Sequence, residues 1–121
     1  MPEQELSDGL VQLGLENVPE LHGRLLEYMA LLEKWNRVHN LTALRNPQKM
    51  VTHHLLDALA VLPHVKETKN LADIGSGGGI PGIPLAMALP RTQVTLVESN
   101  QKKSTFLVQA RIVLKLENVG V

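Results

Sequence analysis

The chain has 121 residues, with 12 Lys and Arg against 12 Asp and Glu, so its formal net charge is zero. Its apolar fraction of 44% is that of a globular domain, which excludes a disordered polar chain and an arm that binds nucleic acid by charge alone. Cysteine is absent, which excludes a disulfide framework and a cysteine zinc site. No apolar run approaches the roughly 20 residues of a membrane span, and the acidic N-terminus is unlike a signal peptide, so we expect a cytoplasmic protein without membrane association.

The first half of the chain is predicted to be helical. Leucines at helical spacing predict a short amphipathic helix over residues 6–15. A longer apolar stripe predicts a second helix over 20–36, with these residues in the core: Leu21, Leu25, Leu26, Met29, Leu32 and Trp35. Residues 38–47 have no period and are expected to form a loop. Residues 48–62 resume a helical pattern, which Pro63 is expected to stop.

The second half alternates between strand and helix patterns. Strands are predicted over 70–74 and 93–98, and residues 118–121 are expected to open a third. Helices are predicted over 80–89 and 101–117, the latter with its inward side formed by Phe106, Leu107, Ala110, Val113 and Leu114. This order predicts an α/β fold with a parallel sheet. We therefore divide the chain into a helical segment, 1–69, and an α/β segment, 70–121.

Five of the nine glycines lie between Gly75 and Gly82, at the end of the first predicted strand. The carboxyl ends of strands are where open α/β sheets bind ligands. Gly75 allows a turn that side chains disfavour, and the absence of Cβ atoms at Gly77 and Gly79 is expected to let a ligand approach the backbone. Glu98 ends the next predicted strand, where its carboxylate can accept hydrogen bonds from both hydroxyls of a ribose.

Two classes of ligand are compatible with this loop. The spacing Gly77-x-Gly79-x-x-Gly82 satisfies the dinucleotide pattern, and Glu98 stands at the expected distance. The spacing from Asp73 through Gly75, Gly77 and Gly79 favours S-adenosylmethionine, because a carboxylate beside the loop suits an ammonium and a sulfonium and would repel a pyrophosphate. Prolines near the helix start also remove backbone donors that a phosphate would need. A glycine-rich turn that binds nothing is the remaining interpretation.

Motifs along nearly the whole chain resemble one known family. They are Trp35-Asn36, Asn40-Leu-Thr42, His54-Leu-Leu-Asp57, the run from Asp73 to Leu85, Leu96-Val-Glu-Ser99, Lys102-Lys103, Phe106-Leu107 and Leu116-Glu-Asn-Val119. With these residues the chain resembles the ribosomal small-subunit methyltransferase G family, also called glucose-inhibited division protein B. That family methylates N7 of a guanine in 16S ribosomal RNA with S-adenosylmethionine. The resemblance implies a Rossmann-like methyltransferase fold over 70–121, with an incomplete parallel sheet, preceded by the helical segment.

The resemblance also implies roles for individual residues. Cofactor contacts are expected at Asp73, Gly75, Ser76, Gly77, Gly79, Ile80, Glu98 and Ser99, with Glu98 on the adenosine ribose. Contacts to 16S ribosomal RNA or the small ribosomal subunit are expected at Lys102, Lys103, Arg111, His54 and Asn40. Thr105 stands where the family commonly has a basic residue. Guanine N7 already carries a lone pair, so positioning should supply most of the acceleration and no catalytic side chain is assigned.

Other side chains allow simpler interpretations. His53 and Asp57 lie four residues apart on a predicted helix, as in some metal sites, but no third ligand is visible, so no metal is expected. An ordinary helix with one buried and one exposed histidine is favoured, and the family resemblance implies that His54 and Asp57 pack near the cofactor loop. The basic residues of the last helix are as consistent with a solvated face as with an RNA contact.

The chain ends in a strand-like run, Asn118-Val-Gly-Val, whereas the family continues well beyond this point. We therefore expect a fragment with two exposed sheet edges that favour self-association. Two alternatives to a methyltransferase remain open: a nucleotide- or dinucleotide-binding module without catalysis, and a fragment that only associates with itself or a partner.

Overall fold

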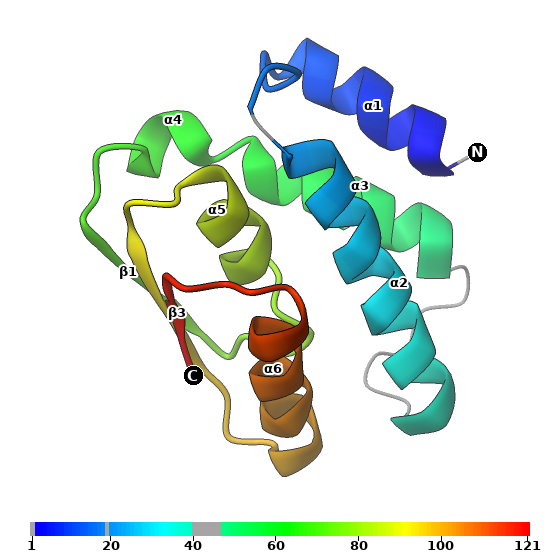
Figure 1. Ribbon diagram of the computed structural model, residues 1–121, viewed down its shortest axis with the longest axis vertical. Helices are drawn as coiled ribbons and strands as arrows, with labels where there is room; N and C mark the ends of the chain where they lie inside the picture. The colour runs from blue at the N-terminus through cyan, green and yellow to red at the C-terminus, as the bar shows by residue number, and fades with distance from the viewer. Residues whose placement is uncertain (1, 19, 40–46) are drawn as a thin grey trace.

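The computed structural model describes residues 2–18, 20–39 and 47–121, and it packs helices against a small sheet (Figure 1). In chain order the elements are α1 (Pro2–Gln12), α2 (Leu21–His39), α3 (Pro47–Leu59), α4 (Leu62–Val65), β1 (Asn70–Ile74), α5 (Gly82–Ala88), β2 (Gln93–Val97), α6 (Gln101–Val113) and β3 (Val119–Gly120). The alternation of strands and helices after residue 70 confirms the predicted α/β class. No helix in these ranges is long and apolar enough to cross a membrane.

The three strands form one parallel sheet in the order β1-β2-β3. The register pairs Asn70 with Gln93 and Ile74 with Val97, so β1 and β2 end side by side. Exposure alternates along β2, where Val94 and Leu96 are buried and their neighbours are exposed. The helices therefore cover one face of the sheet, the arrangement visible in Figure 1. β1 and β3 are the outer strands of the sheet, and self-association through them stays a prediction.

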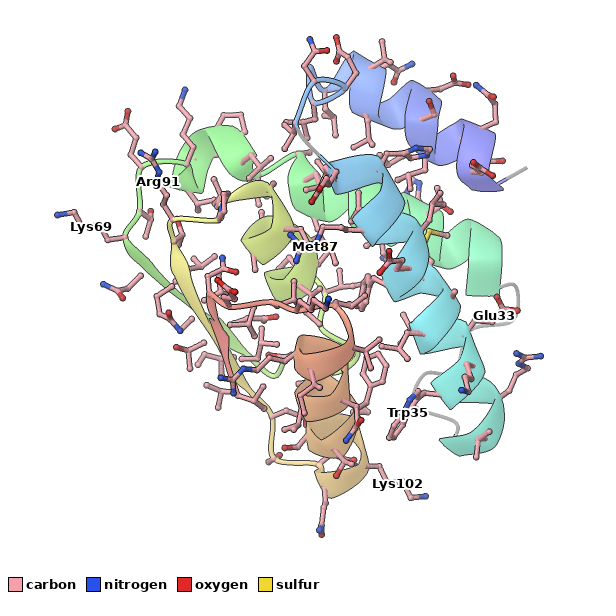
Figure 2. All side chains as sticks on the ribbon, in the orientation of Figure 1. Glu33, Trp35, Lys69, Met87, Arg91 and Lys102 are labelled. Carbon is pink, nitrogen blue, oxygen red and sulfur yellow. The ribbon has the colours of Figure 1, made fainter. Side chains whose placement is uncertain are left out.

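One continuous core joins the N-terminal helices to the sheet. Buried side chains from α1 to α3, such as Leu6, Leu25 and Leu55, belong to the same cluster as Leu96 of β2 and Phe106 of α6. Figure 2 shows side chains filling the space between these elements. The predicted stripe on α2 is confirmed as core, with Leu21, Leu25 and Leu32 buried and Leu26, Met29 and Trp35 packed against them.

Two helices end in local caps that the apolar pattern did not reveal. The first helix was predicted over 6–15, but α1 ends at Gln12, because Gly14 takes a positive φ of 73° and Leu15 N–H donates to Leu10 O at 2.8 Å. The last helix was predicted to reach Glu117, but α6 ends at Val113. Lys115 has a φ of 53°, and Leu116 N–H donates to Arg111 O at 3.0 Å. The predicted inward position of Val113 is therefore wrong, since its side chain is 53% exposed.

The role predicted for Pro63 is also wrong. The helix α3 ends at Leu59, before the proline, and a separate short helix, α4, begins at Leu62 with Pro63 in its first turn. Proline is favoured there because the first turn of a helix does not use its backbone N–H groups within the helix. The second helix extends to His39, so Val38, predicted to lie in a loop, is helical and exposed.

Candidate cofactor-binding site

The glycine loop lies at the carboxyl end of β1 and is hydrogen-bonded to the end of β2. Gly75 N–H and Ser76 N–H both donate to Val97 O, at 2.8 and 3.1 Å. Gly79 N–H donates back to Ser76 O at 2.8 Å, which closes a tight turn before α5. The loop is thus fixed at the edge of the sheet where the sequence predicted a ligand site.

Gly75 and Gly77 form the open side of the loop. Their φ values are 75° and 57°, in the left-handed region that side chains disfavour. A Cβ atom built on either residue meets no heavy atom within 4 Å. The backbone at these two positions therefore borders open space, as the approach of a ligand to Gly77 would require, and the ligand contact itself stays a prediction.

Gly79 and Gly82 serve packing instead. A Cβ on Gly79, whose φ is 97°, would lie 2.5 Å from Ile83 Cδ1 and 3.2 Å from Leu107 Cδ2. A Cβ on Gly82 would lie 2.3 Å from Leu96 Cδ2. The missing side chain of Gly79 therefore lets the loop pack against α5 and α6, and its predicted contact with a ligand stays a prediction.

Asp73 connects the end of β1 to the start of α5. Its Oδ2 accepts a hydrogen bond from Gly82 N–H at 3.1 Å, while Ser76 Oγ, which is buried, donates to the Asp73 carbonyl at 2.8 Å. Burial raises the pKa of Asp73, and the negative charge of Glu98 raises it further, although the hydrogen bonds from Gly82 and Ser76 act in the opposite direction.

Glu98 follows β2 and tethers the loop from the other side. Its Oε1 accepts from Gly77 N–H at 2.7 Å, and its Oε2 accepts from Asn100 N–H at 2.9 Å. The hydrogen bonds from Asn100 and Gly77 hold the pKa of Glu98 below its usual range, so this carboxylate stays ionised. Each carboxylate oxygen has a second lone pair, so Glu98 can also accept from ligand hydroxyls while it holds the loop.

Tyr28 of α2 is a site residue that the sequence analysis missed. Its side chain is fully buried, and its hydroxyl donates a hydrogen bond to the Gly78 carbonyl oxygen. Burial raises the pKa of Tyr28 and the nearby Asp73 carboxylate raises it further, so the phenol stays protonated and remains a donor. The signal was available in the sequence: Tyr28 lies between Leu25 and Leu32 at helical spacing, on the buried face.

Replacing Tyr28 with phenylalanine should lower the free energy of unfolding by about 1 kcal/mol, because the Gly78 carbonyl loses its donor while the ring remains. Chemical denaturation measures this change. The affinity of the glycine loop for its ligand should fall as well, because the lost hydrogen bond holds Gly78, the residue that follows Gly77 in the loop. Leu26→Ala, which removes a partly buried side chain of the same helix, should reduce stability without a specific loss of affinity. Equal affinity of Tyr28→Phe and the unaltered chain would contradict this role.

The structure separates the basic residues that were predicted to contact RNA. Lys102 and Lys103 lie in the first turn of α6, and the charge of Lys103 also lowers the pKa of Glu98. Arg111 lies in the last turn of the same helix, and at about 1.5 Å of rise per residue it is far from the loop. Ser99 is exposed beside Glu98, and Ile80 is half-buried in the loop.

The two histidines of α3, His53 and His54, are placed differently from their prediction. His53 and His54 are both exposed, so the expected pair of one buried and one exposed histidine is wrong. His53 Nε2 lies 3.5 Å from Asp57 Oδ2 on the surface of α3, and His54 and Asp57 are exposed and not packed into the loop. Where the structure describes the chain, no group of three or more potential ligands could hold a metal ion. Asn40 lies outside the described residues.

Comparison with known proteins decides the family. The sequence profile described as GidB, rRNA small subunit methyltransferase G, matches residues 21–121. The chain belongs to this family. Relatives named "Ribosomal RNA small subunit methyltransferase G" include those of Nitrosospira multiformis (57% identity, covering 99% of this chain and 55% of the relative), Nitrosomonas eutropha (50%, 98% and 56%) and Pseudomonas syringae pv. syringae (51%, 98% and 55%).

Membership of the rRNA small subunit methyltransferase G family agrees with the parallel α/β architecture, which is a partial Rossmann-like methyltransferase fold preceded by helices. The match begins at Leu21, the first residue of α2, and therefore includes Tyr28, the glycine loop and Glu98. The chain spans about half the length of the curated relatives it matches.

Proposed function

We propose that the protein binds S-adenosylmethionine at the glycine loop and serves in methyl transfer to RNA of the small ribosomal subunit, at N7 of a guanine. The observation that carries this proposal is the pair of carboxylates, Asp73 and Glu98, on either side of a loop whose open glycines border free space. The names of the relatives support the RNA substrate, since they describe methyltransferases of small-subunit ribosomal RNA.

The geometry favours S-adenosylmethionine over a dinucleotide. The N–H of Gly82, at the start of α5, is already bonded to Asp73 and is not free for a phosphate. Pro81 precedes this helix and Pro84 lies in its first turn, so both positions lack a donor. A dinucleotide would place its pyrophosphate close to the negative charge of Asp73, whereas the ammonium and sulfonium of S-adenosylmethionine are attracted by it.

The residues present are suited to that cofactor. Gly75 and Gly77 leave room at the backbone, Asp73 offers a negative charge, and Glu98 offers acceptors for the ribose hydroxyls. When bound, S-adenosylmethionine supplies an activated methyl group on its sulfonium. The loop and its two carboxylates then contribute by position, because guanine N7 needs no base to remove a proton. Lys102, Lys103, Arg111, His54 and Asn40 remain the proposed RNA contacts.

Cofactor affinity should fall as the pH decreases, and Asp73 should titrate before Glu98. Burial raises the pKa of Asp73 whereas hydrogen bonds lower that of Glu98, so Asp73 loses its charge first. The stability of the fold should change in the opposite direction. The folded chain binds the Asp73 proton more tightly than the unfolded chain does, so protonation of Asp73 stabilises the fold as the pH decreases. Calorimetric titration at decreasing pH measures the affinity. Asp73→Asn should bind more weakly and lose this dependence, and a wild-type affinity that is constant through the range where Asp73 protonates would contradict the assignment.

Transfer of a labelled methyl group tests the proposed function. The chain is incubated with labelled S-adenosylmethionine and with either small ribosomal subunits or naked 16S ribosomal RNA. The proposal expects label in one guanine, at N7, and no label with Gly77→Val. A chain that binds both S-adenosylmethionine and the RNA but incorporates no label would contradict the transfer, and label on another base would contradict the N7 specificity.

A further inference from the structure

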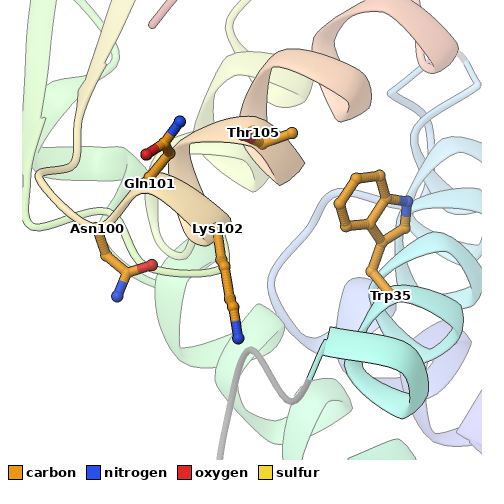
Figure 3. Close-up of a pocket in the computed structure, with 5 residues that line it drawn as sticks. All are labelled: Trp35, Asn100, Gln101, Lys102 and Thr105. Carbon is orange, nitrogen blue, oxygen red and sulfur yellow. The ribbon is translucent and has the colours of Figure 1, made fainter.

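A pocket lies between α2 and the start of α6. Its volume is about 560 Å³, and the described residues that line it are Trp35, Asn100, Gln101, Lys102 and Thr105 (Figure 3). This volume is within the roughly 300–1,000 Å³ of small-molecule sites. None of these five residues belongs to the glycine loop. The pocket nevertheless adjoins the cofactor site, because Asn100 N–H donates to Glu98 Oε2.

The walls of the pocket combine an aromatic ring, amides and a cation. Trp35 extends from α2 toward α6, and its ring meets Phe106 edge to face with centroids 5.7 Å apart, which holds the indole in place. The Asn100 side chain caps α6 by accepting from Lys103 N–H at 3.1 Å, which fixes the amide at the pocket wall. Lys102 is exposed in the first turn of α6.

These groups match the chemistry of a nucleotide. Single-stranded RNA is recognised by stacking of unpaired bases on aromatic rings, by hydrogen bonds to base edges and by cations on the phosphates. The cofactor is a poorer occupant, since the glycine loop and Glu98 are absent from the lining. The described lining also contains no carboxylate, whereas the cofactor site has two.

We propose that this pocket binds one nucleotide of single-stranded RNA, with its base stacked on Trp35 and its phosphate beside Lys102. The inference rests on the proposed function, because RNA of the small subunit is the proposed substrate. It adds a specific site on the chain where that RNA is held, outside the cofactor site.

The fluorescence of Trp35 offers a direct test, because it is the only tryptophan of the chain. The chain is titrated with a short purine-rich RNA and with an RNA of equal length that lacks its bases. Stacking should quench the emission with the first RNA and not with the second. Free guanosine monophosphate and S-adenosylmethionine are titrated separately, and each should cause much less quenching than the RNA.

Charge variants test the phosphate contact through the anisotropy of labelled RNA. Lys102→Gln should weaken RNA binding by at least about threefold and reduce its salt dependence, because one phosphate contact is lost. Lys69→Gln removes the same charge from an exposed residue on the other side of the molecule (Figure 2) and should have little effect.

Trp35→Phe keeps a smaller ring and should weaken binding less than Trp35→Ala, for which a loss of roughly tenfold is expected.

Several results would overturn the inference: no RNA binding, RNA binding without a change in Trp35 emission, equal quenching by the RNA without bases, or equal effects of Lys102→Gln and Lys69→Gln. Quenching by S-adenosylmethionine alone would assign the pocket to the cofactor, and equal quenching by the mononucleotide would assign it to free nucleotides. Calorimetry with S-adenosylmethionine on the same samples keeps the two proposals apart. A chain that binds RNA at Trp35 but not this cofactor would contradict only the proposed function.

Discussion

Replacing Gly77 with valine should abolish binding of S-adenosylmethionine. The φ of Gly77 is 57°, which a β-branched residue adopts only with strain, and its Cβ would point into the open space beside the loop. The side chain would occupy room that the cofactor needs and would disturb the hydrogen bond from Gly77 N–H to Glu98. We expect a loss of affinity of at least about tenfold, or about 1.4 kcal/mol, in calorimetric titration.

Gly14→Val is the matched control for this variant. Gly14 also has a positive φ, 73°, and a Cβ there would likewise meet nothing within 4 Å, but this residue lies in the turn after α1. Both variants should therefore carry a similar backbone strain, of about 1–2 kcal/mol. Only Gly77→Val should lose the cofactor. If both variants bind S-adenosylmethionine as the unaltered chain does, the loop is not the site.

Gly82→Ala should destabilise the fold by about 1–3 kcal/mol, because it adds a methyl group to a packed interior. The new Cβ would lie 2.3 Å from Leu96 Cδ2 and 2.9 Å from Asp73 Oδ2, so these two side chains or the start of α5 must shift. Chemical denaturation measures the change. Because the shift also reaches the Asp73 carboxylate, the affinity for S-adenosylmethionine should fall in the same variant.

Gly23→Ala should instead stabilise the fold. Gly23 lies on the exposed side of α2, and a Cβ there would meet nothing within 4 Å. Alanine stabilises a helix interior relative to glycine by about 0.5–1 kcal/mol. If Gly82→Ala were as stabilising as Gly23→Ala, the close packing of α5 on the sheet would be disproved.

The strands and the loop were predictable because their signals are local. The residues of β2 alternate in hydrophobicity and are rich in β-branched side chains, and the glycine run begins directly after β1. Glu98 could be placed opposite the loop because parallel strands end at the same edge of a sheet. The hydrogen bond from Gly77 N–H to Glu98 follows from that topology, because it joins the two strand ends at this edge.

Other features depend on contacts that the sequence does not display. The role of Gly79 is set by Ile83 and Leu107, and the second of these lies on a different helix. The end of α6 depends on Lys115 in a left-handed conformation, which no glycine marks in the sequence. Tyr28 could be recognised as buried from its spacing, but its bond to Gly78 joins residues 50 positions apart and required the fold.

The central claim, that the glycine loop binds S-adenosylmethionine, is tested most directly by calorimetric titration of the chain with S-adenosylmethionine and, in parallel, with NAD. The carboxylates of Asp73 and Glu98 predict binding of S-adenosylmethionine and weaker or undetectable binding of NAD. Tighter binding of NAD would contradict this account, as would a folded chain that binds neither ligand.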